Sequence, residues 1–446
     1  MRYKFSGLDP IEDIESYRPG GLYPVSIGDV FANGRYKVLH KLGCGGSSTV
    51  WLARNQRPQS LASETLVALR ILSAKKSSKP KDEIPDLAIP LKLDALASAS
   101  HSTARYNLLP IKDHFMEEGP NGTHLCTVSQ FAGPSVFSMC YPEFRSAGSK
   151  RLRGDLARKV AKQVATVVEF MHSAGIVHGG SSDSHLCQMY RLLSSDLTSN
   201  NIPFWVIDQA HRWSDNEIYS TLGKPETEEV LTVDDSPPEP HAPAELVASV
   251  NAVVSSFLEE NIVVVDFGQS FDINAEWKDH NADNAGTVIH YFPPEGRFDN
   301  VVSPASDIWG LACAIFEIRA GCPLFSTFLA SNATILRDTV LTLGKLPELW
   351  WSAFEKRHEW FEENGEPKPP LTKEPVRERL QMIGVHDMPP QRCDDGPMIE
   401  PVGTRLEEEE VVLLSDLLEK LLKYRPEERI TIQEVVNHPW FEYACM

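Results

Sequence analysis

Alternation of hydrophobic and polar residues predicts short β-strands in the first third of the chain. Arg35–Leu42 alternates, Ser48–Ala53 is rich in β-branched and aromatic side chains, and Thr65–Leu72 continues in the same way. Gly43–Gly46 separates the first two segments and predicts the turn of a hairpin. Lys75–Pro80 is polar and is interpreted as a loop. Strand signals of this kind continue to about residue 130.

Beyond Pro134 the hydrophobic spacing changes to the three-to-four-residue period of helices. The clearest such helix carries its apolar face on Leu156, Val160, Val164, Val167 and Met171. Because these positions recur on one side, we expect the helix to bury that side. Asn261–Asp266 is an apolar strand signal, and helical patterns resume at Asp307–Ile318 and Glu408–Lys423.

These patterns divide the chain into three parts. Residues 1–34 are rich in proline, glycine and acidic residues and predict an extended lead-in. Residues 35–133 are rich in strands, and residues 134–446 are rich in helices. Within the last part, residues from about 190 to 260 are polar and proline-rich and are interpreted as an insertion. Strands followed by helices predict an α+β fold.

Composition narrows the classes of partner. The chain has 446 residues, 42% of them hydrophobic, which is enough for a large core. Lysine and arginine number 43 and aspartate and glutamate 62, so the formal net charge is −19. Such a surface disfavours nucleic acid and anionic membranes and suits basic partners, although the charge could also serve solubility alone.

The cysteines and the amino-terminal residues indicate a reducing compartment inside the cell. The eight cysteines include no C-x-x-C pair, which suits buried or free thiols in a reducing environment better than disulfides or a zinc site. The first residues contain no apolar run of the kind found in signal peptides, and no segment approaches the ~20 apolar residues of a membrane span. We expect a soluble monomer in the cytoplasm, the nucleus or both.

A glycine-rich segment is the first candidate for ligand binding. It runs Leu42-Gly43-Cys44-Gly45-Gly46-Ser47-Ser48-Thr49-Val50 and matches the pattern G-x-G-x-x-[G/S]-x-V. Glycines in such a hairpin let backbone N–H groups approach phosphate oxygens without a Cβ in the way. Taken alone, the motif is better explained by a tight hairpin without a ligand. The strand that follows at the expected distance favours phosphate binding.

That strand ends in Val67-Ala68-Leu69-Arg70, where the phosphate-binding pattern is V-A-x-K. Lysine at the last position holds the α- and β-phosphates. Arginine is longer, planar and fork-shaped, so Arg70 either contacts a phosphate or fills the site itself. Its acidic partner on the next helix is either Glu83 or Asp86. Prolines nearby disturb the helical pattern, so the sequence does not decide between the two.

Asp266-Phe267-Gly268 is the candidate metal-binding element. The tripeptide follows an apolar strand, which is the setting of the D-F-G sequence. A carboxylate in this position can hold Mg²⁺ against the phosphates of a nucleotide. Asp266 is therefore the predicted metal ligand, although a tripeptide of this kind also arises by chance.

Three further elements predict a scaffold rather than chemistry. Tyr291–Glu295 resembles the A-P-E element, and Asp307 precedes Ile308–Leu311 as an aspartate that opens a central helix. Arg429 stands where an arginine would pair with Glu295. We expect this ion pair to be structural, with a stabilising effect that depends on its burial.

The chain resembles the SR-protein kinase family, in particular its divergent fungal members, from about residue 12 to residue 444. The family marks are Tyr17–Val25, Gly28–Val30, Lys41–Ala53, Asn121–Cys126, Leu222–Val230, Val265–Phe271 and Ser306–Cys313. The resemblance implies a two-lobed kinase fold with a hinge near Gln130–Gly133. It also implies ATP as phosphate donor, Mg²⁺ as cofactor, and serines of Arg/Ser-rich proteins as acceptors. Ala68, Gln130 and Ala132 would join the glycine-rich segment and Arg70 in contacting the nucleotide.

The catalytic loop departs from the family pattern H-x-D-[I/L]-K-P-x-N-I-L. Aligned from His178, the aspartate position is Gly180, the lysine position is Ser182 and the asparagine position is His185. The aspartate accepts the proton of the substrate hydroxyl, and the asparagine binds a second Mg²⁺. Loss of a general base costs about 10²–10⁴-fold in rate. Asp183 is a possible substitute if the loop is remodelled.

Three hypotheses follow from this departure. The first is a catalytically impaired kinase homologue, a pseudokinase, that binds nucleotide and acts by binding basic or Arg/Ser-rich proteins. The second is an active serine/threonine kinase with displaced catalytic groups, which the intact Asp266 keeps open. The third is a scaffold without nucleotide, which is favoured if Arg70 fills the site.

Overall fold

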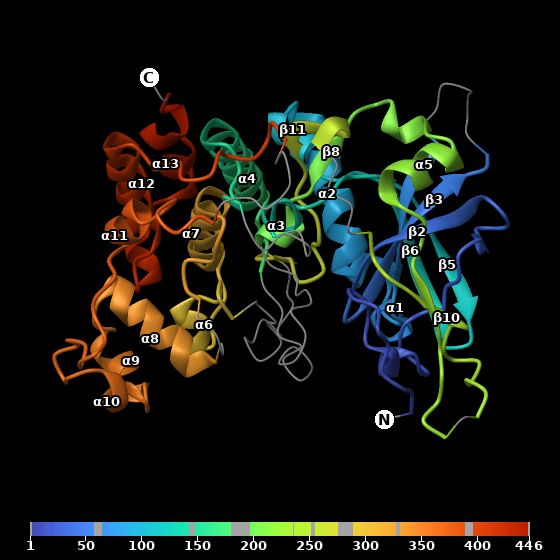
Figure 1. The fold of residues 1–446 in the computed structure, drawn as a ribbon, viewed down its shortest axis with the longest axis horizontal. Coiled ribbons are helices and arrows are strands. Elements are labelled where there is room, and N and C mark those ends of the chain that lie inside the picture. Colours follow the sequence, from blue (N-terminus) through green and yellow to red (C-terminus); the bar gives the residue numbers. More distant parts are fainter. Residues whose placement is uncertain are drawn as a thin grey trace.

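The structure is a computed structural model that shows two lobes, a sheet-rich one and a helical one (Figure 1). It describes residues 2–57, 65–141, 148–179, 197–234, 236–250, 255–274, 289–326, 331–388 and 396–444. The antiparallel sheet comes first in the chain and most helices follow it, so the predicted two-lobed α+β fold is confirmed. The predicted boundaries of the three parts stay predictions.

The N-terminal lobe is built on a six-stranded sheet in the order β1-β2-β3-β4-β6-β5. The strands are β1 Val30–Phe31, β2 Tyr36–Gly45, β3 Ser48–Asn55, β4 Leu66–Leu72, β5 Ile111–Gly119 and β6 Gly122–Gln130. β2 pairs with β3 as far as Gly45 opposite Ser48. The predicted turn at Gly43–Gly46 is therefore wrong in its extent, because only Gly46 and Ser47 connect the two strands.

Two helices follow β4 in the N-terminal lobe. α1 spans Ala74–Ser77, and its N-cap Ser73 accepts a hydrogen bond from the backbone N–H of Lys76. The predicted loop at Lys75–Pro80 is therefore wrong in its first residues. α2 spans Pro85–Ser100 and tolerates Pro90 in its interior. Proline there removes one backbone hydrogen bond, which the helix survives because its inner side is buried.

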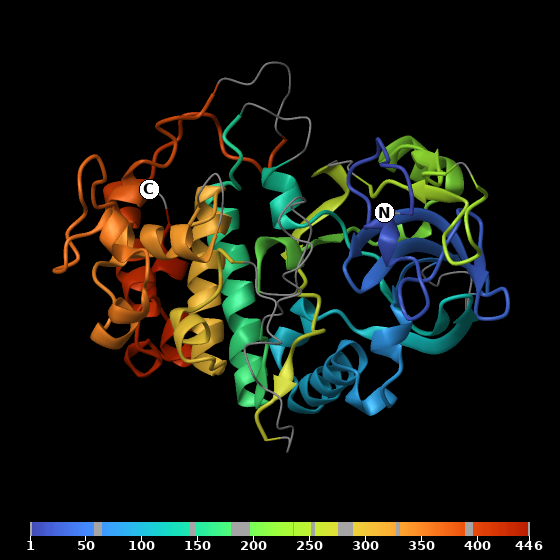
Figure 2. The same cartoon turned by 90° about the horizontal axis from the view of Figure 1, so that it is seen from below.

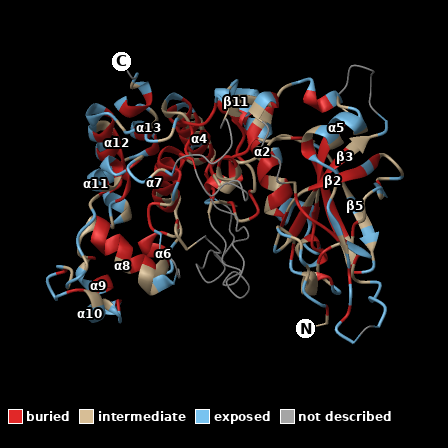
Figure 3. Cartoon of the chain, in the orientation of Figure 1, coloured by how far each residue is buried: buried red, intermediate tan, exposed pale blue. Residues whose placement is uncertain are grey.

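The C-terminal lobe is packed around α4 Gly154–Ser173 and α7 Pro304–Ala320, whose residues are largely buried (Figure 3). Around them lie α3 Val136–Cys140, α6 Pro294–Phe298, α8 Asn332–Leu343, α9 Glu348–Ala353, α10 Arg357–Trp360, α11 Val376–Gln381, α12 Glu408–Leu421 and α13 Ile432–Val436. All five apolar positions predicted for α4 are at most 1% exposed. Among the described residues, no helix has the length and apolar character needed to span a bilayer.

The described part of the insertion begins between the two lobes, packs against the N-terminal lobe and ends between the lobes again (Figures 1 and 2). It contains β8 Phe204–Val206, α5 Asp215–Leu222, β9 Thr227–Glu229, β10 Glu245–Val247 and β11 Leu258–Ile262. β8 pairs with β11 beside the hinge, where Gly133 N–H donates to the carbonyl of Phe204 at 2.8 Å. Arg54 on β3 reaches Asp215 on α5 at 2.6 Å. The insertion thus connects the two lobes a second time. β11 ends at Ile262, so the predicted strand to Asp266 is wrong at its end.

The lead-in packs on the sheet through buried charge as well as apolar contacts. Lys41 on β2 is fully buried and pairs with Glu12, which also accepts a hydrogen bond from the Tyr17 hydroxyl. Lys41 Nζ donates in addition to the carbonyl of Val247 at 2.9 Å. One lysine therefore joins the lead-in, the sheet and the insertion, and it has partners for its charge in the interior.

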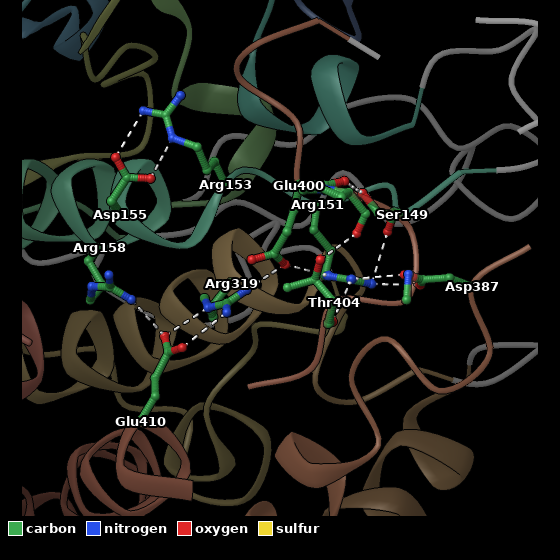
Figure 4. A network of polar contacts seen from close by, with 12 residues as sticks. Ser149, Arg151, Arg153, Asp155, Arg158, Arg319, Asp387, Glu400, Thr404 and Glu410 are labelled. Carbon is green, nitrogen blue, oxygen red and sulfur yellow. Dashed lines mark hydrogen bonds and ion pairs between the residues drawn. The ribbon is translucent and has the colours of Figure 1, made fainter. Parts of the chain in front are cut away.

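A network of buried ion pairs holds the C-terminal lobe together (Figure 4). Its members are Arg151, Arg158, Arg319, Asp387, Glu400 and Glu410. Arg319 on α7 lies at the centre and contacts Glu400 at 3.1 Å and Glu410 on α12 at 2.8 Å. Three positive and three negative groups balance one another, as buried charges require.

Glu317 on α7 predicts a pH dependence of stability. It is buried, and its Oε2 has no hydrogen-bond partner among the described residues. Burial raises the pKa of its carboxyl from the ordinary 4.5 to about 7, although a hydrogen bond with Ser199 opposes the shift. A raised pKa favours the folded state below pH 4.5, and this contribution is lost as the pH rises through about 7.

The shift in the pKa of Glu317 corresponds to about 3 kcal/mol of unfolding free energy, which the unaltered protein loses as its carboxyl ionises. The Glu317→Gln variant has no carboxyl to ionise and should not show this loss. Urea unfolding at pH 5 and pH 8 measures this effect. At pH 8 we therefore expect the unfolding free energy of the variant to exceed that of the unaltered protein by this amount. A difference between the two proteins that is the same at both pH values would contradict the assignment.

Candidate functional site

Arg70 lies at the centre of a charged cluster beneath the sheet. It is placed on β4, where it stands opposite Val50 of β3 and Thr127 of β6. Its Nε donates to Ser48 Oγ at 3.1 Å. Its Nη2 lies 2.9 Å from Asp86 Oδ1 and 2.9 Å from Asp266 Oδ1. One guanidinium nitrogen therefore bridges two carboxylates that are far apart in the sequence.

Asp86 is the acidic partner of Arg70, and Glu83 is not. Asp86 is in the first turn of α2, where the helix dipole stabilises a carboxylate, and its side chain is 1% exposed. Glu83 precedes α2 and is exposed. Aspartate is shorter than the glutamate of kinases and arginine is longer than their lysine, so the two exchanges compensate in length.

Asp266 adopts a left-handed backbone conformation with φ of 65°. Aspartate is one of the few residues besides glycine that tolerate this region. Burial would raise the pKa of its carboxyl, but the positive charges of Arg70 and Lys76 outweigh burial and hold that pKa below its ordinary value. Burial would likewise lower the pKa of Arg70, but Asp266 and Asp86 outweigh it. The pair is therefore ionised.

Gly268 explains why the element after Asp266 ends in glycine. A Cβ at this position would lie 2.8 Å from Asp86 Oδ1 and 3.1 Å from Lys76 Nζ, so any other residue would require these two side chains to shift. Phe267 is buried, and its ring lies 5.6 Å from the ring of His178. The D-F-G element thus packs directly on the charged cluster and on the start of the catalytic loop.

Lys76 is a second cation of the cluster that the sequence did not reveal. It is placed by the single turn of α1, and its Nζ lies 3.6 Å from Asp86 Oδ2. In the sequence it is one of several lysines in a polar segment. The only local signal for its position was Ser73, which caps α1.

The glycine-rich segment forms the strand pair above the cluster. Ser48 Oγ accepts the hydrogen bond from Arg70, and Ser47 accepts one at its carbonyl from the N–H of Ser73. A Cβ added at Gly43 or Gly46 would meet no atom within 4 Å, so the described residues leave space beside these two glycines. This is compatible with an approaching phosphate.

Other residues predicted to contact nucleotide have different neighbours. Cys44 lies 3.9 Å from Ser249 of the insertion, and burial raises the pKa of its thiol to about 12. Thr49 is buried and accepts a hydrogen bond from Trp51. Leu42 packs partly buried against the apolar cluster shared with α5. These side chains are structural, and any contact with a ligand at their positions would come from the backbone.

The hinge residues lie beside the insertion. Gln130 Nε2 is 2.9 Å from Nε2 of His211, and a Cβ at Gly133 would lie 2.5 Å from Leu258 Cδ2. Ala68 on β4 is buried and Ala132 is partly exposed. The structure places Ala68 on the interior strand β4, Gln130 at the end of β6 and Ala132 just beyond it, and their contact with nucleotide stays a prediction.

The start of the catalytic loop is anchored by Asp307. The backbone N–H groups of His178 and Gly179 donate to its two carboxylate oxygens at 2.8 and 3.1 Å, and His172 contacts it at 2.9 Å. Ser270 donates to the carbonyl of His178 at 2.8 Å. The chain is therefore held up to the residue before the aspartate position.

The three substituted catalytic positions, Gly180, Ser182 and His185, and the possible substitute Asp183 lie outside the described residues.

The predicted scaffold ion pair is present. Arg429 donates from Nη1 and Nη2 to the two carboxylate oxygens of Glu295, both at 2.7 Å, and the side chains are 1% and 2% exposed. Ser306 also donates to Glu295 at 2.9 Å. The pair connects α6 with the segment before α13, and its burial means that removal of one partner would leave the other charge unpaired in the interior.

The described residues fit a divalent cation poorly. Magnesium prefers octahedral oxygen ligands, usually one or two carboxylates plus phosphates. Asp266 already receives a charge-assisted hydrogen bond from Arg70, and Asp86 is buried against Arg70 and Lys76. No group of three or more acidic, histidine or cysteine residues in the described part of the chain is placed to hold a metal ion. Magnesium use by protein kinase domains in general therefore does not carry over directly to this cluster.

Comparison with known proteins agrees with the fold and the motifs. The protein kinase domain model matches residues 251–441. The serine/threonine-protein kinase SRPK of Physarum polycephalum is 23% identical over 439 residues, which cover 96% of this chain and 91% of that protein. Protein kinase dsk1 of Schizosaccharomyces pombe and serine/threonine-protein kinase SKY1 of Saccharomyces cerevisiae are each 30% identical over 37% of this chain. The matched regions cover 29% and 21% of those two relatives.

The two-lobed fold, the glycine-rich strand pair and the Asp266–Gly268 element define a protein kinase domain. Within that class the chain is most simply described by its similarity to SR-protein kinases: it aligns with SRPK of Physarum polycephalum over nearly its whole length and with dsk1 and SKY1 over part of it.

Proposed function

We propose that this protein is a pseudokinase of the SR-protein kinase type that binds nucleotide and acts by binding basic or Arg/Ser-rich proteins. One observation carries the proposal. Arg70 contacts both Asp86 and Asp266, the residues that the kinase motifs assign to a nucleotide site, while the sequence has Gly180 and Ser182 in place of the aspartate and lysine that serve transfer. Binding groups without a proton acceptor support retention of the ligand more than turnover.

A basic partner is supported by charge. The net charge of −19 attracts arginine-rich segments and disfavours nucleic acid. The related protein named SRSF protein kinase 3 in Homo sapiens, which is 30% identical over 168 residues, supports the same class of partner by its name. We propose that the protein acts as a monomer in the cytoplasm, the nucleus or both. The described cysteines form no disulfide with one another, which suits a reducing compartment.

An active serine/threonine kinase is the second candidate. It is favoured by Asp307, which holds the backbone of His178 and Gly179 at the start of the catalytic loop, and by the ionised Asp266. In that case Asp183 would have to accept the proton of the substrate hydroxyl.

Two binding measurements test the proposal. Thermal unfolding with saturating ATP should show a higher midpoint than without nucleotide, because a ligand that binds only the folded state stabilises it. A labelled Arg-Ser repeat peptide should bind, and its affinity should fall as salt is raised because the attraction is electrostatic. A Glu-Ser repeat of equal length serves as control. Absence of any effect of ATP would favour a scaffold without nucleotide, and equal binding of both peptides would contradict the proposed partner.

A further inference from the structure

The charged cluster at the nucleotide position carries two cations where kinases carry one. Arg70 occupies the lysine position, and Lys76 joins it from α1. Facing them are the carboxylates of Asp86 and Asp266. Within this part of the chain the four groups balance in charge before any ligand arrives. A kinase with one lysine and two carboxylates instead has a negative excess that a metal ion offsets.

The bridging nitrogen of Arg70 competes with a metal ion for the same carboxylate. Nη2 lies 2.9 Å from Oδ1 of Asp266 and equally far from Oδ1 of Asp86. A divalent cation bound to Asp266 would have to displace this hydrogen bond or lie beside two positive side chains. The family asparagine that would hold a second ion is His185 in this sequence, and a neutral imidazole is a poor ligand for magnesium.

We infer that a nucleoside triphosphate binds this cluster without a divalent cation, with Arg70 turning to the phosphates while Lys76 stays paired with Asp86. The inference rests on the proposed nucleotide binding and specifies the ionic form of the ligand. Arg70 suits a phosphate because its planar fork makes two parallel hydrogen bonds.

Lys76 has a distinct task in this arrangement. Asp86 is 1% exposed, so it needs a positive partner when Arg70 turns toward a phosphate. Lys76 Nζ, at 3.6 Å from Asp86 Oδ2, is placed to remain as that partner. The neighbouring Lys75 is exposed on the same helix. Lys76 is therefore a positioning residue, and Lys75 offers a matched control with the same charge.

Calorimetric titration of the full chain with ATP tests the inference, once in excess EDTA and once in excess Mg²⁺. We expect the two dissociation constants to agree within about threefold, well inside the tenfold that one charge-assisted contact is worth. Binding that is tenfold or more weaker in EDTA would overturn the inference while leaving the proposed nucleotide binding intact. Absence of binding in both buffers would overturn the proposed function as well.

Three variants separate the roles of the cations in the same titration. Lys76→Gln should weaken binding in EDTA by about tenfold, whereas Lys75→Gln should not change it. Equal weakening by both would contradict the role of Lys76. Arg70→Lys removes the guanidinium nitrogen that bridges the two carboxylates. This variant should bind ATP more strongly in Mg²⁺ than in EDTA by about tenfold. If Arg70→Lys stays indifferent to Mg²⁺, the competition between Arg70 and the metal is contradicted.

Discussion

Restoring the four family residues should raise the rate of phosphoryl transfer to an Arg-Ser peptide by about 10²–10⁴-fold. The variant combines Gly180→Asp, Ser182→Lys, His185→Asn and Arg70→Lys. The physical reason is that the restored aspartate accepts the proton of the substrate hydroxyl, while the lysines and the asparagine restore the positioning on which phosphoryl transfer depends. Single-turnover transfer from γ-labelled ATP, with Mg²⁺ in the buffer, measures the gain relative to the unaltered protein.

The gain must come from the same site to support this account. Adding Asp266→Asn to the restored variant should abolish the transfer, because Asp266 is the D-F-G carboxylate that we propose faces the nucleotide beside Arg70. Adding Asp183→Ala should leave the gain unchanged, because the restored aspartate replaces any function of Asp183. A restored variant that is no faster than the unaltered protein would show that the loop substitutions are not what limits transfer.

Breaking the buried pair between Glu295 and Arg429 should lower the free energy of unfolding by about 3–5 kcal/mol. In Glu295→Ala the guanidinium of Arg429 loses both hydrogen bonds at 2.7 Å and stays buried at 1% exposure. An uncompensated buried charge explains a loss of this size, whereas an exposed ion pair contributes at most about 1 kcal/mol. Urea unfolding monitored by tryptophan fluorescence, with comparison of midpoint and slope, measures the loss.

Arg425 provides the matched control for this effect. It lies four residues before Arg429, its side chain is 56% exposed, and its contact with Glu427 is 4.0 Å long. Arg425→Ala should change the unfolding free energy by less than about 0.5 kcal/mol. If Arg425→Ala and Glu295→Ala lowered the unfolding free energy by similar amounts, the loss could not be assigned to the burial of the Glu295–Arg429 pair.

Much of the scaffold could be predicted because its signals are local or repeat along the chain. The one-sided apolar period of α4 and the apolar runs of α7 and α12 appear directly in the sequence, and the helices lie where those patterns are. The pairing of Glu295 with Arg429 and the closeness of Arg70 to Asp266 came from motifs whose order along the chain is diagnostic.

The partners of Arg70 depended on where one helix begins. From the sequence, Pro85 is expected to disturb the helix, but proline is well suited to the first helical position, and α2 starts there. This start places Asp86 in the first turn and leaves Glu83 outside the helix. Lys76 depended on a helix of a single turn, whose pattern is too short to be distinguished from a loop.

The course of the insertion could not be predicted from local signals. Its contacts with the N-terminal lobe join residues more than 140 positions apart, such as Arg54 with Asp215 and Thr65 with His211. The sequence showed only its polar and proline-rich composition, which is typical of any surface segment. Contacts of this range arise from packing of the whole fold.

The central claim is that the groups proposed to bind nucleotide persist, whereas the residue that accepts the proton of the substrate hydroxyl is missing. Single-turnover phosphoryl transfer by the unaltered protein tests this claim most directly. The protein is mixed in excess over γ-labelled ATP, together with an Arg-Ser repeat peptide. We predict labelling of the peptide no faster than with the Asp266→Asn variant. Transfer near the ~1–100 s⁻¹ of typical protein kinases, and its loss in Asp183→Ala, would contradict the account.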